Sequence, residues 1–175
     1  ENITTLGFRG EALASIQSVS RLSLSSRTAD SELGWRIKDE GEIEPIKHAV
    51  GTSVEVRDLF FKVPARRKFL RKPQTEFRYI DDAVRRLALS AMHVAMQLKH
   101  DDKIMRSVSV ARNAKSEDNR VADILGASFI ANSVRLEFRS SGMRLWGWLG
   151  LPSFSRSQGD MQFFYVNNRF IRDRV

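Results

Sequence analysis

Short runs of alternating apolar and polar residues constrain the fold of this chain more than any other feature of its sequence. The clearest run lies within residues 51–60, where Val54, Val56 and Phe60 are interleaved with charged residues. A period of two places apolar side chains on one face of a sheet, so this run predicts a strand. Because several such strands are joined by hairpin turns and are mixed with helices, the sequence predicts an α+β fold.

The other predicted elements follow from the same two periodicities. Further strands are expected at residues 22–25, 35–38, 43–46, 94–98, 108–110, 134–138, 145–149 and 163–166. Turns are expected at residues 101–102, 140–142 and 167–168. Apolar residues at helical spacing predict helices that begin near Gly10, span residues 77–91 and span residues 121–129. The polar, non-periodic residues 111–119 are predicted to form a linker.

Basic residues are concentrated in one part of the chain. The net charge is +8, and residues 60–115 hold fourteen lysines and arginines against five aspartates and glutamates. The densest run contains Lys62, Arg66, Arg67, Lys68, Arg71 and Lys72. Such a surplus favours a polyanionic partner, of which nucleic acid is the commonest. Phe69 and Phe77 are interpreted as core residues, so the run does not predict a platform on which bases stack.

Composition excludes several other classes of protein. Cysteine is absent, so disulfides and thiolate metal sites are excluded. There is no apolar stretch of about 18 residues and no secretory signal, so no membrane span is expected. His48, His93 and His100 lack ligand spacing, and no metal site is assigned to this chain.

Carboxylates and arginines in residues 78–86 allow two interpretations. Arg78 and Arg86 each lie four residues from Asp82, a spacing that suits exposed ion pairs on a helix. The Asp81-Asp82 pair is interpreted as solvated rather than catalytic, because no histidine or lysine partner is near in sequence. Arg85 is less well explained by pairing, which leaves a role in binding an anion open.

Gly7-Phe8-Arg9-Gly10 is a glycine-bracketed loop before a predicted helix. Glycines let the backbone turn tightly and let a ligand approach without meeting a Cβ atom. The first amides of a helix lack internal partners and carry the positive end of its dipole, so a phosphate chain satisfies them. An ordinary loop with a glycine near a helix cap is the alternative reading of this run alone.

Three runs resemble motifs of the MutL family within the GHKL ATPase superfamily. Residues 7–16 are similar to the third ATP-binding motif of that family. Residues 51–52, with 58–61 and 64–70, are similar to the fourth motif and the segment after it. Residues 165–169 and 172–174 are similar to the Tyr-Val-Asn-Gly-Arg segment of the domain after the ATPase. The three runs follow the family order and span nearly the whole chain.

The sequence departs from the family pattern at two places. Lys62-Val63 stands where Asn-Thr is common, and Asn168 stands where glycine is usual. Asparagine tolerates the left-handed conformation better than most residues, so the turn at 167–168 is expected to survive.

The resemblance implies the fold and the domains. Residues 1–114 are expected to be the back half of a GHKL-type α/β sandwich ATPase domain, carrying the lid and the basic segment. Residues 115–175 are expected to begin a ribosomal protein S5 domain 2-like (transducer) domain. The chain starts at Glu1 rather than Met, and we expect it to be an internal piece of a longer protein.

The resemblance also implies site residues. Those expected to wrap the phosphates of ATP, largely through backbone amides, are Gly7, Phe8, Arg9, Gly10, Glu11, Ala12 and Leu13. Thr52 is expected near the adenine end, and Arg85 and Arg172 match arginines implicated in binding the DNA backbone. No catalytic side chain is expected here: the general-base glutamate, the asparagine that holds Mg²⁺ and the adenine-reading motif are expected before residue 1. A lysine that reaches the γ-phosphate is expected after residue 175.

The implied function is an ATP-driven switch in DNA mismatch repair. ATP closes the lid and favours a homodimer that clamps DNA without reading sequence, and the implied partners are MutS, a MutH-type endonuclease and a UvrD-type helicase. The implied location is the bacterial cytoplasm. Two alternatives stay open at this point: another GHKL ATPase, such as a gyrase B-like subunit, and a basic DNA-binding module with no nucleotide site.

Overall fold

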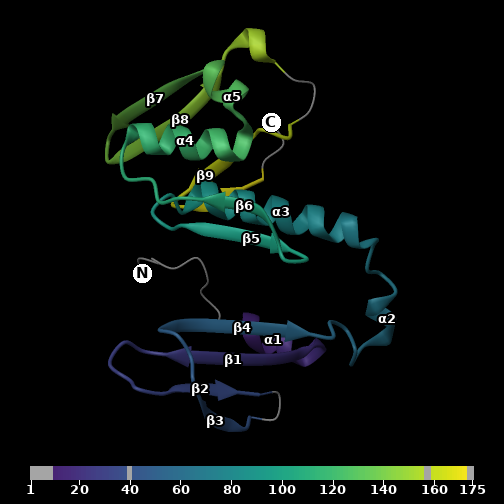
Figure 1. Cartoon of the computed structure of the whole chain (residues 1–175). Coiled ribbons are helices and arrows are strands. Elements are labelled where there is room, and N and C mark those ends of the chain that lie inside the picture. The colour runs from purple at the N-terminus through teal and green to yellow at the C-terminus, as the bar shows by residue number, and fades with distance from the viewer. Residues whose placement is uncertain (1–9, 39–40, 156–158, 173–175) are drawn as a thin grey trace. The chain divides into compact units, whose positions relative to one another are not determined.

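The computed structural model describes residues 10–38, 41–155 and 159–172, and the chain divides into two compact units, Glu1–Lys72 and Pro73–Val175 (Figure 1). Every strand pair among the described residues is antiparallel, and helices occur in both units. The prediction of an α+β fold is therefore confirmed. No helix in these ranges is both long and apolar enough to cross a membrane.

The first unit is a four-stranded sheet with two short helices. Its strands, in the spatial order β3-β2-β1-β4, are Ile43–Ile46, Gly34–Ile37, Arg21–Arg27 and Gly51–Arg57. Helix α1 (Ala12–Val19) precedes β1, and helix α2 (Pro64–Arg67) follows β4. All four strands were predicted from alternation, but β4 ends at Arg57. Phe60 lies beyond it in the left-handed region, at φ 64°, so it does not belong to the strand as predicted.

The register of this sheet separates a polar face from an apolar face. Leu24 of β1 lies opposite Val54 on one side and Ile37 on the other, whereas Ser25 lies opposite Ser53 and Arg36. Because side chains alternate along each strand, the apolar residues share one face. Within the described residues that face is largely open: Trp35 is 52% and Val54 is 49% exposed. A sheet with one open apolar face can pack against a second layer on that face.

The second unit combines helices with three hairpins. Its helices are α3 (Pro73–Ser90), α4 (Ala114–Leu125), α5 (Ala127–Ala131) and the short 3₁₀ helix η1 (Pro152–Phe154). Its hairpins are β5–β6 (Met96–His100 and Lys103–Val108), β7–β8 (Ser133–Ser140 and Met143–Gly150) and β9–β10 (Phe164–Val166 and Arg169–Ile171). The predicted hairpin turns at 101–102, 140–142 and 167–168 are confirmed.

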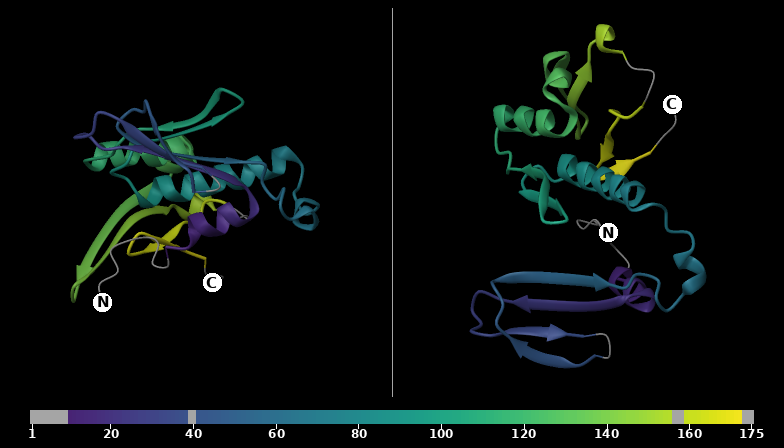
Figure 2. Two further views of the ribbon diagram at one scale, coloured as in Figure 1. Left: turned by 90° about the horizontal axis from the view of Figure 1, so that it is seen from below. Right: turned by 45° about the vertical axis from the view of Figure 1, so that its right-hand side comes forward.

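The main apolar core lies in the second unit, where α3, α4 and α5 meet. Its buried members are Ala88, Val108, Val121, Ile124, Leu125 and Phe129. Side chains that pack around them include Leu89, Met96, Trp148, Phe154 and Phe163. The β9–β10 hairpin lies against α3 in both views of the ribbon (Figures 1 and 2). The long helix and the C-terminal hairpin are therefore parts of one packed body.

The linker predicted at residues 111–119 is wrong over most of its length, because α4 begins at Ala114. Asn113 caps this helix: its side chain accepts a hydrogen bond from the Ser116 amide, and the Ser116 hydroxyl accepts one from the Asn113 amide. This reciprocal cap gives hydrogen-bond partners to two amides at the start of the helix. Its residues are polar, which is why the sequence predicted a linker here. The helix predicted at 121–129 is two helices, because Gly126 takes φ 98° between them.

The compact units do not coincide with the predicted domains. The contacts divide the chain after Lys72, whereas the predicted division is at 114/115. Helix α3 and the β5–β6 hairpin pack with α4 because Ala88, Val108 and Val121 share the core. A domain boundary set by ancestry does not have to be the place where few contacts cross, and the division at 114/115 stays a prediction.

Candidate functional site

The predicted phosphate-binding loop is described only from its last glycine onward. Gly7, Phe8 and Arg9 lie outside the described residues, whereas Gly10, Glu11, Ala12 and Leu13 lie within them. Gly10 takes φ +67°, a conformation that side-chain-bearing residues rarely adopt. Among the described residues other than its chain neighbours, no atom lies within 4 Å of where its Cβ would be. The backbone here therefore needs glycine for its conformation.

At the start of α1, no side chain of the described residues caps the helix. Glu11 occupies the N-cap position and makes no capping hydrogen bond, and the first turn contains no acidic residue. Ala12, Leu13 and Ala14 cannot accept a hydrogen bond through their side chains. An anion could therefore use these amides without displacing a side-chain cap. The phosphate-binding role of residues 10–13 stays a prediction.

Thr52 lies on the apolar face of the first unit. It pairs with Ser26 across β1 and β4, and the two hydroxyl oxygens are 2.9 Å apart. The opposite end of the same ladder, where Arg21 pairs with Arg57, is the end that follows α1. Thr52 is exposed on this face, and its place near the adenine end stays a prediction.

Arg85 and Arg86 are neighbours on α3 with different surroundings. Arg86 pairs with Asp82, which confirms one of the two predicted i,i+4 pairs, and its guanidinium lies 4.6 Å from the centre of the Phe170 ring. Arg85 makes no hydrogen bond or ion pair with the described residues, and its Nε is buried without a partner. Its guanidinium lies 5.6 Å from the centre of the Phe163 ring.

Asp81 is held by Arg106 of β6, so it cannot neutralise Arg85. The two Arg106 nitrogens Nε and Nη2 reach both Asp81 oxygens, the second at 2.9 Å, and both side chains are 23% exposed. The interpretation of Asp81 as solvated is therefore wrong, because Arg106 holds it in a half-buried ion pair, whereas Asp82 forms the ion pair with Arg86 that its spacing predicted. A bidentate pair of this kind crosslinks α3 and the β5–β6 hairpin.

The β9–β10 hairpin supplies an aromatic surface beside these arginines. Tyr165 donates its hydroxyl hydrogen to the backbone oxygen of Arg86 at 2.9 Å, and its ring lies 5.6 Å from that of Phe170. The Phe163 and Phe170 rings are 6.2 Å apart. Burial raises the pKa of Tyr165 to about 12, with Arg86 opposing and Asp82 adding to the shift. The phenol therefore stays protonated and able to donate at neutral pH.

Arg172 follows β10 directly and is exposed. The turn that leads to it contains Asn167 and Asn168 at φ 49° and 62°. Two consecutive left-handed residues form the tight turn that suits a two-residue hairpin. Asparagine at position 168 therefore keeps the hairpin, as the sequence predicted for this departure from glycine. Arg172 and Arg85 both belong to the second unit, whereas Thr52 and residues 10–13 belong to the first.

The basic run forms the α2 region and remains at the surface. Lys62, Arg66, Arg67, Lys68, Arg71 and Lys72 are all exposed or half-exposed. Phe69 is 82% exposed, so its predicted place in the core is wrong. The run lies between β4 and α3. Phe77 is half-buried, and its ring lies 4.2 Å from that of His100.

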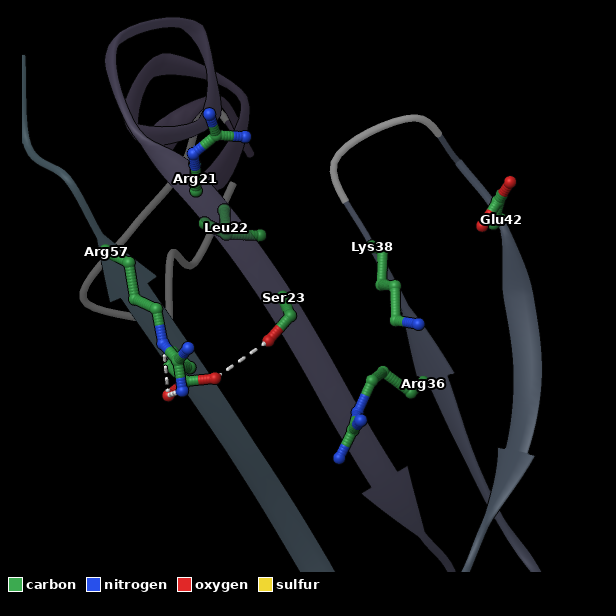
Figure 3. Close-up of a pocket in the computed structure, with 8 residues that line it drawn as sticks. Arg21, Leu22, Ser23, Arg36, Lys38, Glu42 and Arg57 are labelled. Carbon is green, nitrogen blue, oxygen red and sulfur yellow. Dashed lines mark hydrogen bonds and ion pairs between the residues drawn. The ribbon is translucent and has the colours of Figure 1, made fainter. Parts of the chain in front are cut away.

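A pocket opens on the polar face of the first unit (Figure 3). Its lining residues are Arg21, Leu22, Ser23, Arg36, Lys38, Glu42, Glu55 and Arg57. Arg57 lies 2.6 Å from Glu55, which also accepts a hydrogen bond from Ser23, and Lys38 lies 3.0 Å from Glu44. The pocket is a network of exposed ion pairs, and its lining includes none of the predicted site residues.

Arg120 is a residue whose importance sequence reasoning missed. It is 2% exposed on α4 and donates to three backbone oxygens: Ala88 at 2.9 Å, Ala91 at 3.2 Å, and Ser109. Burial lowers its pKa, and the charge of Asp123 opposes that shift. An arginine in a polar stretch reads as solvent-exposed, and no sequence signal marks a guanidinium that satisfies a helix C-terminus.

Related proteins match this chain along its whole length. The family described as "DNA mismatch repair protein, C-terminal domain" matches residues 121–175. The DNA mismatch repair protein MutL of Pseudomonas fluorescens (strain SBW25) is 49% identical over 180 residues, covering 100% of this chain and 28% of that protein. MutL of Azotobacter vinelandii matches with the same identity and coverage. The chain thus spans little more than a quarter of the length of these relatives.

Solved structures match over nearly the whole chain as well. The "Aquifex aeolicus MutL ATPase domain complexed with ADP" has a TM-score of 0.75 at 31% identity, covering 94% of this chain and 63% of that one. The "ATPase domain from bacterial mismatch repair endonuclease Aquifex aeolicus MutL" has a TM-score of 0.69 at 27% identity, covering 96% of this chain and 65% of that one.

Proposed function

Because the chain belongs to the MutL family of DNA mismatch repair proteins, we propose that it carries part of an ATP-driven switch that acts on DNA. In this proposal ATP binds at the loop before α1, is hydrolysed by the intact protein, and favours a homodimer of the ATPase region. The ADP found in the related Aquifex aeolicus domain supports a nucleotide as the ligand.

The observation that carries the nucleotide part is the uncapped start of α1 behind a glycine at positive φ. Gly10, Glu11, Ala12 and Leu13 would present backbone amides to the phosphates, with Gly7, Phe8 and Arg9 completing the loop. Such amides are fixed in place before the ligand arrives, so little reorganisation is needed on binding. Thr52 would serve at the adenine end. Mg²⁺ would accompany the nucleotide, and no residue of this chain is assigned to it.

The nucleotide assignment is tested with two glycine variants of the intact protein. Gly10→Ala is expected to weaken ATP binding at least about tenfold, because it disturbs charge-assisted hydrogen bonds worth about 1.5–3 kcal/mol each. Gly41→Ala is the matched control, since Gly41 also has positive φ, at +80°, and no atom near the missing Cβ. Equal ATP affinity for the two variants would contradict the assignment. We further expect residues 1–175 alone to show no Mg²⁺-dependent turnover, and turnover abolished by Gly10→Ala would refute that expectation.

A specific observation favours a second activity, contact with the DNA backbone. Arg85 has no acidic partner among the described residues, and Arg172 is exposed after β10 in the same unit. Uncompensated arginines bind phosphates without reading bases, and the net charge of +8 fits a polyanion.

The DNA assignment predicts a change in the salt dependence of binding. Arg85→Glu and Arg172→Glu in the intact protein should each weaken DNA binding and lower the slope of log affinity against log salt by about 1 or more. Unchanged affinity and slope would remove these residues from the interface.

MutS, a MutH-type endonuclease and a UvrD-type helicase are the partners we propose downstream, in the bacterial cytoplasm. We also propose that the domains divide at 114/115, which the family match over residues 121–175 supports.

A further inference from the structure

We infer that the β9–β10 hairpin positions Arg85 for DNA, with the Phe163 ring as the direct support and Tyr165 as the residue that fixes the hairpin to α3. This inference rests on the proposed contact between Arg85 and DNA. It adds that residues of the predicted second domain determine how well an arginine of the predicted first domain binds.

Arg85 has no acidic partner among the described residues. Asp81, four residues before it, is engaged by the Nε and Nη2 nitrogens of Arg106, and Asp82 is engaged by Arg86. The Arg85 guanidinium lies 5.6 Å from the centre of the Phe163 ring. An aromatic face attracts a guanidinium without occupying its hydrogen-bond donors. The ring can therefore orient Arg85 and still leave its Nη donors available to a phosphate.

Contacts of Tyr165 and Phe170 with Arg86 attach the β9–β10 hairpin to α3. Tyr165 donates to the Arg86 oxygen at 2.9 Å, one residue from Arg85, and the Phe170 ring lies against both Tyr165 and the Arg86 guanidinium. Tyr165 also stays protonated at neutral pH, so the hydrogen bond persists under working conditions. These contacts hold the hairpin on the last two turns of α3. Phe163 precedes β9 directly, so its ring position depends on this attachment.

The strand alternation provides a matched control. Phe163 packs against the core cluster, whereas Phe164 is 62% exposed on the other side of the strand. Phe163→Leu keeps an apolar side chain but removes the aromatic face beside Arg85. Phe164→Leu makes the same chemical change one residue away. For the hydroxyl, Tyr165→Phe is matched by Tyr79→Phe, since Tyr79 lies on α3 and is 52% exposed.

The experiment measures DNA affinity of the intact protein across a salt series. Phe163→Leu and Tyr165→Phe are each expected to weaken binding about three- to tenfold, the range that corresponds to one cation–π contact or one hydrogen bond. The salt slope should fall by up to about 1, as it does when one phosphate contact is lost. A merely structural role would not change that slope. Phe164→Leu and Tyr79→Phe are expected to bind as the unmodified protein does.

A double-mutant cycle separates this inference from the proposal on which it rests. In an Arg85→Gln background, Phe163→Leu should cause no further loss, because its effect passes through Arg85. If Arg85→Gln alone leaves DNA affinity unchanged, the proposed DNA contact fails. If Arg85→Gln weakens binding while Phe163→Leu does not, or if the two losses multiply, the DNA contact stands and the positioning role is overturned. Tyr165→Phe in the same background gives an independent second reading.

Discussion

Replacing Arg120 by methionine should destabilise the second unit by about 3 kcal/mol. The side chain is 2% exposed and donates to the oxygens of Ala88, Ala91 and Ser109. Methionine can replace the aliphatic part of the arginine side chain, but it has no donor, so the oxygens lose their partner. The Ala91 oxygen also accepts the Val94 amide at 3.0 Å and keeps that bond. The cost therefore falls mainly on Ala88 and Ser109.

The magnitude follows from two opposing effects. Leaving the buried Ala88 carbonyl without a hydrogen bond costs about 1–3 kcal/mol, and the part-buried Ser109 carbonyl adds a smaller cost, so the two together cost about 2–5 kcal/mol. Removing a buried charge also removes its desolvation cost, whose presence is visible in the lowered pKa of Arg120. The net loss is expected near the lower half of that range. Arg120→Lys should lower the free energy of unfolding by less than Arg120→Met, because the lysine ammonium can still donate to one of these oxygens. It should still lose some stability, because an ammonium cannot span three separate oxygens as a guanidinium does.

Urea unfolding of the 175-residue chain, followed by tryptophan fluorescence, measures this loss. Trp148 packs against the core of the second unit and reports its unfolding. With a slope of about 1.5–2 kcal/mol per molar urea, a loss of about 3 kcal/mol lowers the midpoint by about 1.5–2 M. Lys115→Met is the matched control, because Lys115 is exposed on the same helix. Equal midpoints for Arg120→Met and Lys115→Met would refute the reasoning.

Three further predictions concern local features of the second unit. Asn113→Ala removes the reciprocal cap of α4 and should cost about 1 kcal/mol, seen as a lower urea midpoint. Gly126→Ala should cost about 1–3 kcal/mol by the same measurement, because φ 98° with ψ 147° is a conformation open mainly to glycine. The raised pKa of Tyr165 predicts that its contribution to stability is fully present below pH 10 and declines as pH rises from about 10 toward 12, because only the unfolded phenol ionises there. Tyr165→Phe should remove the absorbance step at 295 nm near pH 12 and flatten that decline; an unchanged titration would contradict the burial of Tyr165.

Strands and turns were predictable wherever local pattern and tertiary contacts agree. The alternation of Val54 and Val56 follows directly from a sheet with one apolar face, and Asn167-Asn168 supplies a left-handed turn by its own conformational preference. Prediction failed at Phe60 and Phe69, where hydrophobicity suggested a strand or a core position. Nothing in the sequence tells which apolar residue will find a partner, and Phe69 stays 82% exposed.

The candidate site was also only partly predictable from the sequence. The glycine loop and the runs shared with the MutL family could be recognised there, since backbone conformation at Gly10 depends on residue type. The surroundings of Arg85 could not be predicted from the sequence. Asp81 lies four residues before Arg85, but Arg106, 25 residues from Asp81, takes that carboxylate.

The sequence by itself determined most of the strands, the hairpin turns, the basic surplus, the Arg86–Asp82 pair and the family, because these depend on residue type and on spacing along the chain. Only the tertiary structure decided how two other arginines are compensated: Arg120 by backbone oxygens, and Arg85 by no acid among the described residues. The physical reason is that the state of a charged side chain depends on groups within a few ångströms, and the fold brings those groups from distant parts of the chain.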